Sequence, residues 1–190
     1  MTVGLFFGSF NPIHIGHLII AQTMLNDGEL EEVWFVVSPQ NPLKDSNSII
    51  HHFDRIDMVE LAIEGNDRFK ACDIEFNLPV PSYTINTLAY ISEKFPSHSF
   101  KLIIGEDNLA SFHKWKNHHV ILDEYGLLVY RREGNNTDNY IDHQNVHFID
   151  APLINISATF IRKKIREYKS FKYLVPEKVE NYIRDKKLYL

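Results

Sequence analysis

The sequence predicts an α/β fold with a doubly wound, mainly parallel sheet and a helical C-terminal extension. Two observations lead to this prediction: short segments are apolar at every residue, and segments with helical patterns lie between them. A strand that is apolar at every position is covered on both faces, as in parallel sheets with helices on each side. The alternation of such strands with helices predicts βαβ units with right-handed crossovers.

The elements follow in chain order. Strands are predicted at residues 3–7, 33–37, 100–104 and 127–130. Helices are predicted at residues 17–26, 53–64, 84–94 and 109–123. In the second helix Ile56, Val59 and Ile63 recur at helical spacing and form one apolar stripe. The tail predicts two more helices, at 157–168 and 176–187, and Pro176 suits the first turn of the last one. The polar segment 133–145 predicts a surface loop.

Composition limits the class of protein. With 190 residues, 44% hydrophobic and 24% charged, the chain can bury one sizeable core, which excludes a disordered or fibrous protein. The formal net charge of −5 argues against bulk nucleic-acid binding and against a polybasic membrane anchor. Cys72 is the single cysteine, so neither an intrachain disulfide nor a CxxC metal knuckle is expected. No repeat, linker, signal peptide or spanning segment is evident, which predicts one cytoplasmic domain over residues 1–190.

The most informative segment joins the first predicted strand to the first predicted helix. It reads Gly8-Ser9-Phe10-Asn11-Pro12-Ile13-His14-Ile15-Gly16-His17. In a doubly wound sheet this turn lies at the carboxyl edge, where ligands bind. Gly8 and Gly16 permit tight turning and a close backbone approach. His14 and His17 are three residues apart, so both rings can face one point near a helix N-terminus, where anions are favoured. Such converging donors suit a phosphoryl group in transfer.

Other interpretations of the two histidines remain open. A single loop histidine is most often an ordinary polar residue. A zinc pair would need a third ligand, and the HExxH spacing is absent. The GxGxxG fingerprint of dinucleotide-binding dehydrogenases is absent as well. Position and composition together favour phosphate binding over these alternatives.

A second candidate phosphate element lies near the C-terminus. Ser157 suits a helix N-cap, and Thr159 and Arg162 follow in the first turns. Two hydroxyls and an arginine fork at a helix N-terminus can hold phosphate oxygens. Lys163 and Lys164 are instead expected on an ordinary solvated face of that helix.

These two segments resemble the paired motifs of the HxGH nucleotidyltransferase superfamily. His14 to His17 match HxGH, and residues 156–162 match ISxTxxR in the expected order. The resemblance implies a Rossmann-like nucleotidyltransferase fold. Members of this superfamily move a nucleotidyl group from ATP or CTP onto a phosphate and release pyrophosphate.

Further segments resemble the bacterial nicotinate-nucleotide adenylyltransferase family across residues 3–189. They are Ser38-Pro39-Gln40-Asn41-Pro42-Leu43-Lys44, Pro81-Ser82-Tyr83-Thr84, Ile104-Gly105-Glu106-Asp107, Phe112 with Trp115, Tyr173-Leu174-Val175-Pro176-Glu177, and the terminal Leu188-Tyr189. The resemblance implies adenylyl transfer from ATP to nicotinate mononucleotide, giving deamido-NAD and pyrophosphate in NAD biosynthesis. It implies Mg²⁺ carried on the ATP phosphates, with no protein metal ligand. The expected partners are these two substrates, without nucleic acid or membrane, and a homo-oligomer stays open.

The resemblance assigns site residues, and the residues themselves fit these assignments. The implied catalytic residues are His14, His17 and Arg162. The implied ATP-binding residues are Gly8, Ser9, Phe10, His14, His17, Gly105, Asp107, Ser157, Thr159 and Arg162. The implied mononucleotide-binding residues are Ser38, Lys44, Tyr83, Thr84 and Trp115.

Simple chemistry supports several of these assignments. Ser82 is expected to cap a helix whose free N–H groups at Tyr83 and Thr84 favour a carboxylate over a carboxamide. Trp115 offers a flat face to a pyridine ring, although a core or lid aromatic explains it equally well. Asp107 can accept hydrogen bonds from ribose hydroxyls. Lys44 can hold a phosphate as a point charge, and a plain surface lysine is the competing interpretation.

The sequence departs from the family pattern at three positions near the site. Phe7 replaces a glycine, Asn11 replaces an aspartate, and Leu43 replaces a histidine. Three alternative functions therefore stay open. They are another HxGH transferase, such as one that prefers nicotinamide mononucleotide, a non-catalytic nucleotide sensor, and a zinc protein that uses His14 and His17.

Overall fold

The computed structural model describes residues 1–39, 49–79, 82–131, 140–152 and 154–190. Within these ranges six strands form one parallel sheet in the order β3-β2-β1-β4-β5-β6. The chain runs outward from β1 to one edge and then returns to build the other half. This is the doubly wound arrangement that the sequence predicts, and its strand order changes direction between β1 and β4.

The strands are short, and the central residues of β1, β2 and β5 are buried. Their bounds are β1 Thr2–Gly8, β2 Glu32–Val37, β3 Phe69–Cys72, β4 Ser99–Gly105, β5 Leu127–Tyr130 and β6 Val146–Ile149. In the ladder between β1 and β2, Gly8 lies opposite Val37. The residues that follow these two strands are therefore neighbours at the carboxyl edge of the sheet.

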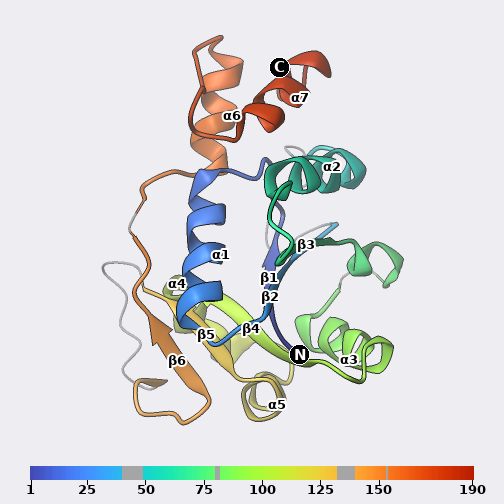
Figure 1. The fold of residues 1–190 in the computed structure, drawn as a ribbon, viewed down its shortest axis with the longest axis vertical. Helices are drawn as coiled ribbons and strands as arrows, with labels where there is room; N and C mark the ends of the chain where they lie inside the picture. Colours follow the sequence, from blue (N-terminus) through green and yellow to red (C-terminus); the bar gives the residue numbers. More distant parts are fainter. Residues whose placement is uncertain (40–48, 80–81, 132–139, 153) are drawn as a thin grey trace.

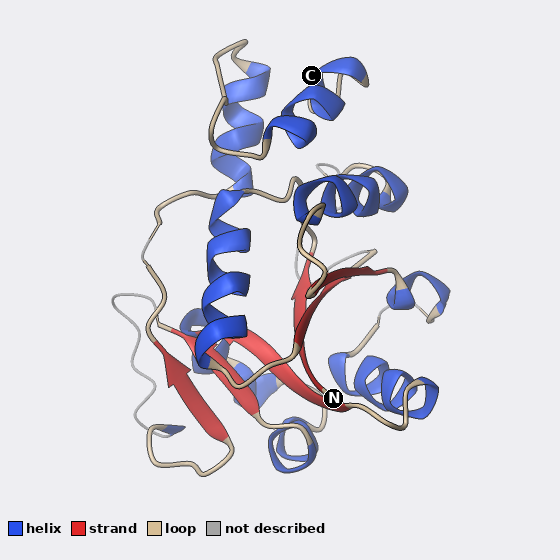
Figure 2. Ribbon diagram, viewed as in Figure 1, coloured by secondary structure: helices blue, strands red, loops and turns tan. Residues whose placement is uncertain are grey.

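Helices cover both faces of the sheet (Figures 1 and 2). Their bounds are α1 Ile15–Asp27, α2 His52–Ile63, α3 Thr84–Lys94, α4 Glu106–Ala110, α5 His118–Glu124, α6 Ala158–Arg166 and α7 Glu177–Asp185, with short 3₁₀ helices η2 Ile74–Asn77 and η3 Phe112–Lys114. On one face, α1 and α2 join a buried cluster that extends to α6 and α7. On the other, α3, α4 and α5 join a second cluster. Successive residues of a strand pack in different clusters: in β2, Phe35 packs in the first cluster and Trp34 in the second.

All four predicted strands are confirmed, and two further strands were missed. The missed strands are β3 and β6, at the two edges of the sheet. Each contains an exposed polar residue, Lys70 in β3 and His147 in β6, so neither has the uninterrupted apolar run of a central strand. The sequence pattern identifies the centre of this sheet better than its edges.

One predicted helix is wrong. Residues 109–123 form the end of α4, then η3, and then α5, rather than a single helix. The residues Leu109, Phe112 and Ile121 are buried in the same cluster. Their spacing therefore resembles the apolar face of a single helix. The chain leaves the helical path at Trp115, whose ψ is 144°, and Asn117 adopts a left-handed φ of 51°. Asparagine tolerates that conformation better than most residues.

The predicted C-terminal helices are present as α6 and α7. Ser157 is the N-cap of α6, as predicted, whereas Pro176 is the N-cap of α7 and precedes its first turn. Figure 1 shows both helices beyond the sheet, with α7 beside α2 and α6 near the start of α1. Among the described residues, no helix is both long enough and apolar enough to cross a membrane.

Candidate active site

The turn after β1 is compact, and the end of β2 lies beside it. The Gly8 carbonyl accepts a hydrogen bond from the Ser38 N–H at 2.9 Å. A Cβ at position 8 would come within 2.8 Å of the Phe10 ring, so glycine is required for this packing. Phe10 has a φ of 43°, and its ring is buried in the core. Phe10 can therefore meet a bound ligand only through its backbone.

The two histidines lie together at the start of α1. This helix begins at Ile15, two residues earlier than predicted, with His14 as its N-cap. The rings of His14 and His17 stack with centroids 3.7 Å apart and planes at 23°. A Cβ at Gly16 would lie 3.1 Å from Nδ1 of His14, so the glycine leaves room for this ring. This stacking is consistent with the expectation that both histidine rings face the same point.

A backbone hydrogen bond sets the proton position on His17. The N–H of His14 donates to Nδ1 of His17 at 3.2 Å. Nδ1 is therefore the acceptor of the neutral ring, and Nε2 carries the proton. Nε2 of His17 is thus a hydrogen-bond donor at the N-terminus of α1.

The second motif meets the first through Arg162. Oγ of Ser157 accepts from the Phe160 N–H at 3.2 Å and caps α6. Nη2 of Arg162 donates to Oγ1 of Thr159 at 3.2 Å, and Nη1 donates to the Asn11 carbonyl at 2.7 Å. Arg162 and Asn11 are 151 positions apart in the chain. The fold therefore joins the N-terminus of α6 to the turn that leads into His14.

The end of β4 adds a carboxylate to this edge. Gly105 is the N-cap of α4, and Asp107 lies in the first turn of that helix. A Cβ at Gly105 would overlap the Asp107 carboxylate and come within 2.9 Å of Tyr130. Glycine at this position is therefore needed for the place that Asp107 takes. Asp107 is exposed at this edge of the sheet.

A buried arginine that the sequence analysis did not single out ties the loops together. Arg55 of α2 is 0% exposed, and its guanidinium donates to four backbone carbonyls. Nη1 donates to Ser9 and Ser38 at 2.6 Å, Nη2 to Pro39 at 2.8 Å, and Nε to Ile50 at 3.2 Å. Burial lowers the pKa of Arg55 to about 10, so the group stays charged at neutral pH. It places a positive charge between the turn after β1 and the end of β2.

A buried carboxylate connects the end of β2 to α3. Glu75 lies in η2 and is 3% exposed, and Oγ1 of Thr87 donates to its Oε1 at 2.7 Å. Burial raises the pKa of Glu75, while hydrogen bonding from Thr87, Ser38 and Ser82 lowers it in part. Glu75 therefore holds two segments that the sequence analysis assigned to the mononucleotide.

The start of α3 differs from the prediction in its cap. Tyr83, and not Ser82, is the N-cap, and the helix begins at Thr84. No side-chain hydrogen bond caps the N-terminus of α3. Nζ of Lys116 lies 4.5 Å from the centroid of the Tyr83 ring. This contact brings the segment after Trp115 to the start of α3.

Trp115 is partly buried beside the cluster that covers the second face of the sheet. Its ring centroid lies 5.5 Å from that of Phe112. Lys44 and Leu43 fall outside the described residues. Among the residues that are described, no group of three or more His, Cys, Asp or Glu side chains could hold a metal ion.

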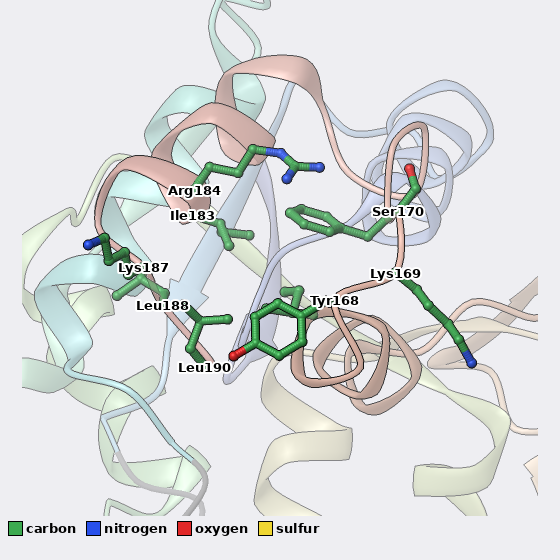
Figure 3. A pocket seen from close by; sticks show the side chains of 10 residues that line it. Tyr168, Lys169, Ser170, Ile183, Arg184, Lys187, Leu188 and Leu190 are labelled. Atoms are coloured by element: carbon green, nitrogen blue, oxygen red, sulfur yellow. The ribbon is translucent and has the colours of Figure 1, made fainter.

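A separate hollow lies in the C-terminal extension, away from these residues. Figure 3 shows this pocket of about 420 Å³ between α6 and α7. Ile165, Phe171, Ile183, Leu188 and Leu190 supply apolar lining, and Arg184 borders it. None of the predicted site residues lines this pocket.

Sequence reasoning missed two buried charged residues around the site, Arg55 and Glu75. Glu75 lies between the apolar residues Ile74 and Phe76. A charged residue inside an apolar run predicts a buried group with specific partners, and that signal could have identified Glu75. Arg55 follows Asp54 and is followed by Ile56 and Asp57, so its neighbours in the sequence carry no such signal.

Comparisons with known proteins agree with this geometry. Residues 5–164 match the cytidylyltransferase-like family. A protein of Cytophaga hutchinsonii named "probable nicotinate-nucleotide adenylyltransferase" is 56% identical over 189 residues, which cover 100% of this chain and 98% of the relative. A protein of Flavobacterium psychrophilum with the same name is 50% identical over 191 residues, covering 100% and 99%.

Solved structures give the same result for the fold. The Plasmodium falciparum nicotinic acid mononucleotide adenylyltransferase complexed with NaAD superposes with a TM-score of 0.82 at 18% identity, covering 99% of this chain and 97% of that one. The complex of that protein with APC gives a TM-score of 0.80 at 18% identity, covering 99% and 96%. At this identity the likeness establishes the fold.

Proposed function

The chain belongs to the cytidylyltransferase-like family and, within it, to the nicotinate-nucleotide adenylyltransferases, and from this membership we propose that His14, His17 and Arg162 carry out its reaction. The enzyme transfers the adenylyl group of ATP to nicotinate mononucleotide, which gives deamido-NAD and pyrophosphate. The residues that hold each substrate follow from the placement of the two motifs.

The triphosphate of ATP binds between the start of α1 and the start of α6. His17 donates from Nε2, because its Nδ1 already accepts from the His14 backbone. Arg162 reaches the same region from α6, where it is held by the Asn11 carbonyl and Thr159. The charge on the phosphate oxygens grows in the transition state, and donors that are already in place stabilise it there.

The transfer is an in-line displacement at phosphorus. An oxygen of the mononucleotide 5′-phosphate forms a bond to the α-phosphorus of ATP. The bond between that phosphorus and the oxygen that bridges to the β-phosphorus breaks, and its electron pair leaves with pyrophosphate. Because the nucleophile is already an anion, no covalent enzyme intermediate is needed, and catalysis consists of positioning and charge stabilisation. His14 and His17 contact the α- and β-phosphates, while Thr159 and Arg162 hold the leaving pyrophosphate.

The mononucleotide binds on the other side of β1, near the end of β2 and the start of α3. Backbone N–H groups at Tyr83 and Thr84 favour the nicotinate carboxylate, whereas a carboxamide presents an N–H₂ group to them. Trp115 offers its face to the pyridine ring. Ser38 and Lys44 contact the phosphate, and Arg55 adds positive charge behind Ser38.

ATP brings Mg²⁺ as part of the substrate, since this ion prefers phosphate oxygens and water. The ribose of ATP binds at Gly105 and Asp107, which follow β4. There the Asp107 carboxylate accepts hydrogen bonds from the ribose hydroxyls. We place the reaction in the cytoplasm, where ATP is available, with ATP and nicotinate mononucleotide as partners.

The hydrogen bond from Arg162 to the Asn11 carbonyl carries this proposal, since it joins the two phosphate motifs. The test is pyrophosphate release from ATP with nicotinate or nicotinamide mononucleotide. We expect kcat/KM to be about tenfold or more higher for the nicotinate form, because the amide leaves backbone donors unpaired. Equal values would contradict the acceptor assignment, and ATP binding without any turnover would indicate a sensor.

A matched variant separates catalysis from folding. His17→Ala should lower kcat by about 10² to 10³, as expected for the loss of one transition-state donor. Its melting temperature should change little, because the His17 ring is only partly buried. A near-normal rate would remove His17 from the mechanism.

A further inference from the structure

The C-terminal residues return to the catalytic region and place a tyrosine there. Residues 187–190 follow α7, and the Leu188 N–H donates to the Ile183 carbonyl at 3.0 Å. Figure 3 shows Leu188 and Leu190 at the pocket between α6 and α7. Tyr189, between them, packs against the core cluster that contains Phe10, Ile13 and Ile161. This terminal segment is therefore held by the Leu188 backbone and by the packing of Leu188 and Tyr189.

The backbone of Tyr189 is strained. Its φ is 67°, and the φ of Lys187 is 52°, so two non-glycine residues of this short segment adopt the left-handed region. Such conformations persist only where the surrounding structure holds them in place. The packing of Leu188 and of Tyr189 itself against the core cluster supplies that restraint.

The Tyr189 hydroxyl is buried without a hydrogen-bond partner among the described residues. An unsatisfied buried hydroxyl is costly and calls for an explanation. Nε of Arg162 is likewise buried and lacks a partner in the described part of the chain. Arg162 is also the charge that acts most strongly on the Tyr189 hydroxyl, followed by Arg55.

Arg55 is a poor partner for this hydroxyl, because all three of its guanidinium nitrogens already donate to carbonyls. Arg162 has one carbonyl and one hydroxyl partner, through its two Nη atoms. Its Nε–H is a donor without an acceptor, and the Tyr189 oxygen is an acceptor without a donor. A hydrogen bond between them would satisfy both groups.

We propose that Tyr189 is a positioning residue whose oxygen accepts the Nε–H of Arg162 when ATP is bound. This inference rests on the proposed function of Arg162 in phosphate binding. The triphosphate competes with Asn11 and Thr159 for the Nη atoms of Arg162, and the bond to Tyr189 then fixes the orientation of the guanidinium. The C-terminal segment thereby contributes to ATP binding without touching ATP.

The test is Tyr189→Phe, which removes only the hydroxyl, beside Tyr173→Phe as a matched control at a tyrosine that is 80% exposed. We expect the KM for ATP to rise about tenfold in Tyr189→Phe, as for a lost hydrogen bond to a charged group, with the KM for nicotinate mononucleotide unchanged. The melting temperature without ligand should not fall, since the hydroxyl has no partner there. Tyr173→Phe should leave both KM values unchanged.

The double variant identifies the route of the effect. In an Arg162→Lys background, which keeps the charge but lacks Nε–H, Tyr189→Phe should change the KM for ATP by less than about twofold. An unchanged KM in the single variant, or an undiminished tenfold rise in the lysine background, would overturn the proposal.

Calorimetric titration with ATP measures the Kd of wild type and of Tyr189→Phe. This comparison does not depend on turnover. Failure of the wild-type enzyme to use nicotinate mononucleotide would overturn the proposed function alone. Equal Kd values for wild type and Tyr189→Phe would overturn the role of Tyr189 alone.

Discussion

Two arginines on different helices bind the same turn, and their surroundings differ. Arg55 of α2 donates to the Ser9 carbonyl and Arg162 of α6 to the Asn11 carbonyl. Arg55 is fully buried, with every guanidinium nitrogen bonded to a carbonyl, whereas Arg162 is partly buried and its Nε has no partner among the described residues. An arginine with all its nitrogens bonded holds the fold, and one with spare donors can serve a substrate.

The largest expected effect concerns Arg55. Arg55→Met should reduce the free energy of unfolding by about 3–5 kcal/mol, since four carbonyls lose a charged donor in the interior. Urea denaturation of the two proteins measures this difference. A loss below about 1 kcal/mol would show that the four carbonyls find other hydrogen-bond donors. It would contradict the structural role that we assign to Arg55 in contrast to Arg162.

A second variant on the same helix shows whether Arg55 also acts on substrates. Met58→Ala removes a fully buried side chain one turn away and should cost about 2–5 kcal/mol through cavity formation. We expect Arg55→Met, and not Met58→Ala, to raise the KM for nicotinate mononucleotide, because Arg55 donates a hydrogen bond to the Ser38 carbonyl. Equal KM values in the two variants would leave Arg55 with a purely structural role.

Arg162 should show the opposite pattern. Arg162→Ala should lower kcat/KM for ATP by about 10² to 10³, because a donor to the leaving pyrophosphate is lost. The free energy of unfolding should fall by about 1 kcal/mol, since the side chain bonds one carbonyl and one hydroxyl at a partly exposed site. Steady-state kinetics and urea denaturation measure the two quantities. A large stability loss with normal kinetics would reverse the assignment of the two arginines.

The smallest effect concerns the buried carboxylate on the mononucleotide side. Burial raises the pKa of Glu75 above its ordinary value of 4.5, so the folded protein keeps this proton to higher pH than the unfolded chain does. The folded state therefore binds more protons above that value, and stability falls as pH rises through the folded pKa. Glu75→Gln removes this penalty and keeps an acceptor for Thr87.

Urea denaturation between pH 4 and pH 8 tests the carboxylate. The stability of Glu75→Gln relative to wild type should be constant at the acidic end and increase as the pH rises. Glu60→Gln, at an exposed position of α2, is the matched control and should follow the wild type. If the free energy of unfolding depends on pH in the same way for Glu75→Gln and wild type, ionisation of Glu75 does not destabilise the folded protein.

The fold could be predicted where burial leaves a simple pattern. The central strands are apolar at every position because helices cover both faces, and β1, β2, β4 and β5 were predicted on that basis. The edge strands include exposed residues such as Lys70, and periodicity does not distinguish them from loops. Residues 109–123 have a helical apolar pattern, but Asn117 interrupts the helix with a left-handed conformation that the pattern does not encode.

The site could be predicted where chemistry is local. The pair His14 and His17 and the Ser157 cap follow from spacing along a single helix. Arg55 could not be predicted in the same way, because its partners are backbone carbonyls from three separate segments. Tyr189 was identified only as part of the closing family segment, because its packing against the cluster that contains Ile161 exists only in the folded chain.

A crystal structure of the enzyme with a non-hydrolysable ATP analogue tests the central claim most directly. The account predicts one triphosphate that contacts both Nε2 of His17 and the Arg162 guanidinium. A triphosphate that contacts only one of these groups, or that binds elsewhere on the molecule, would contradict it.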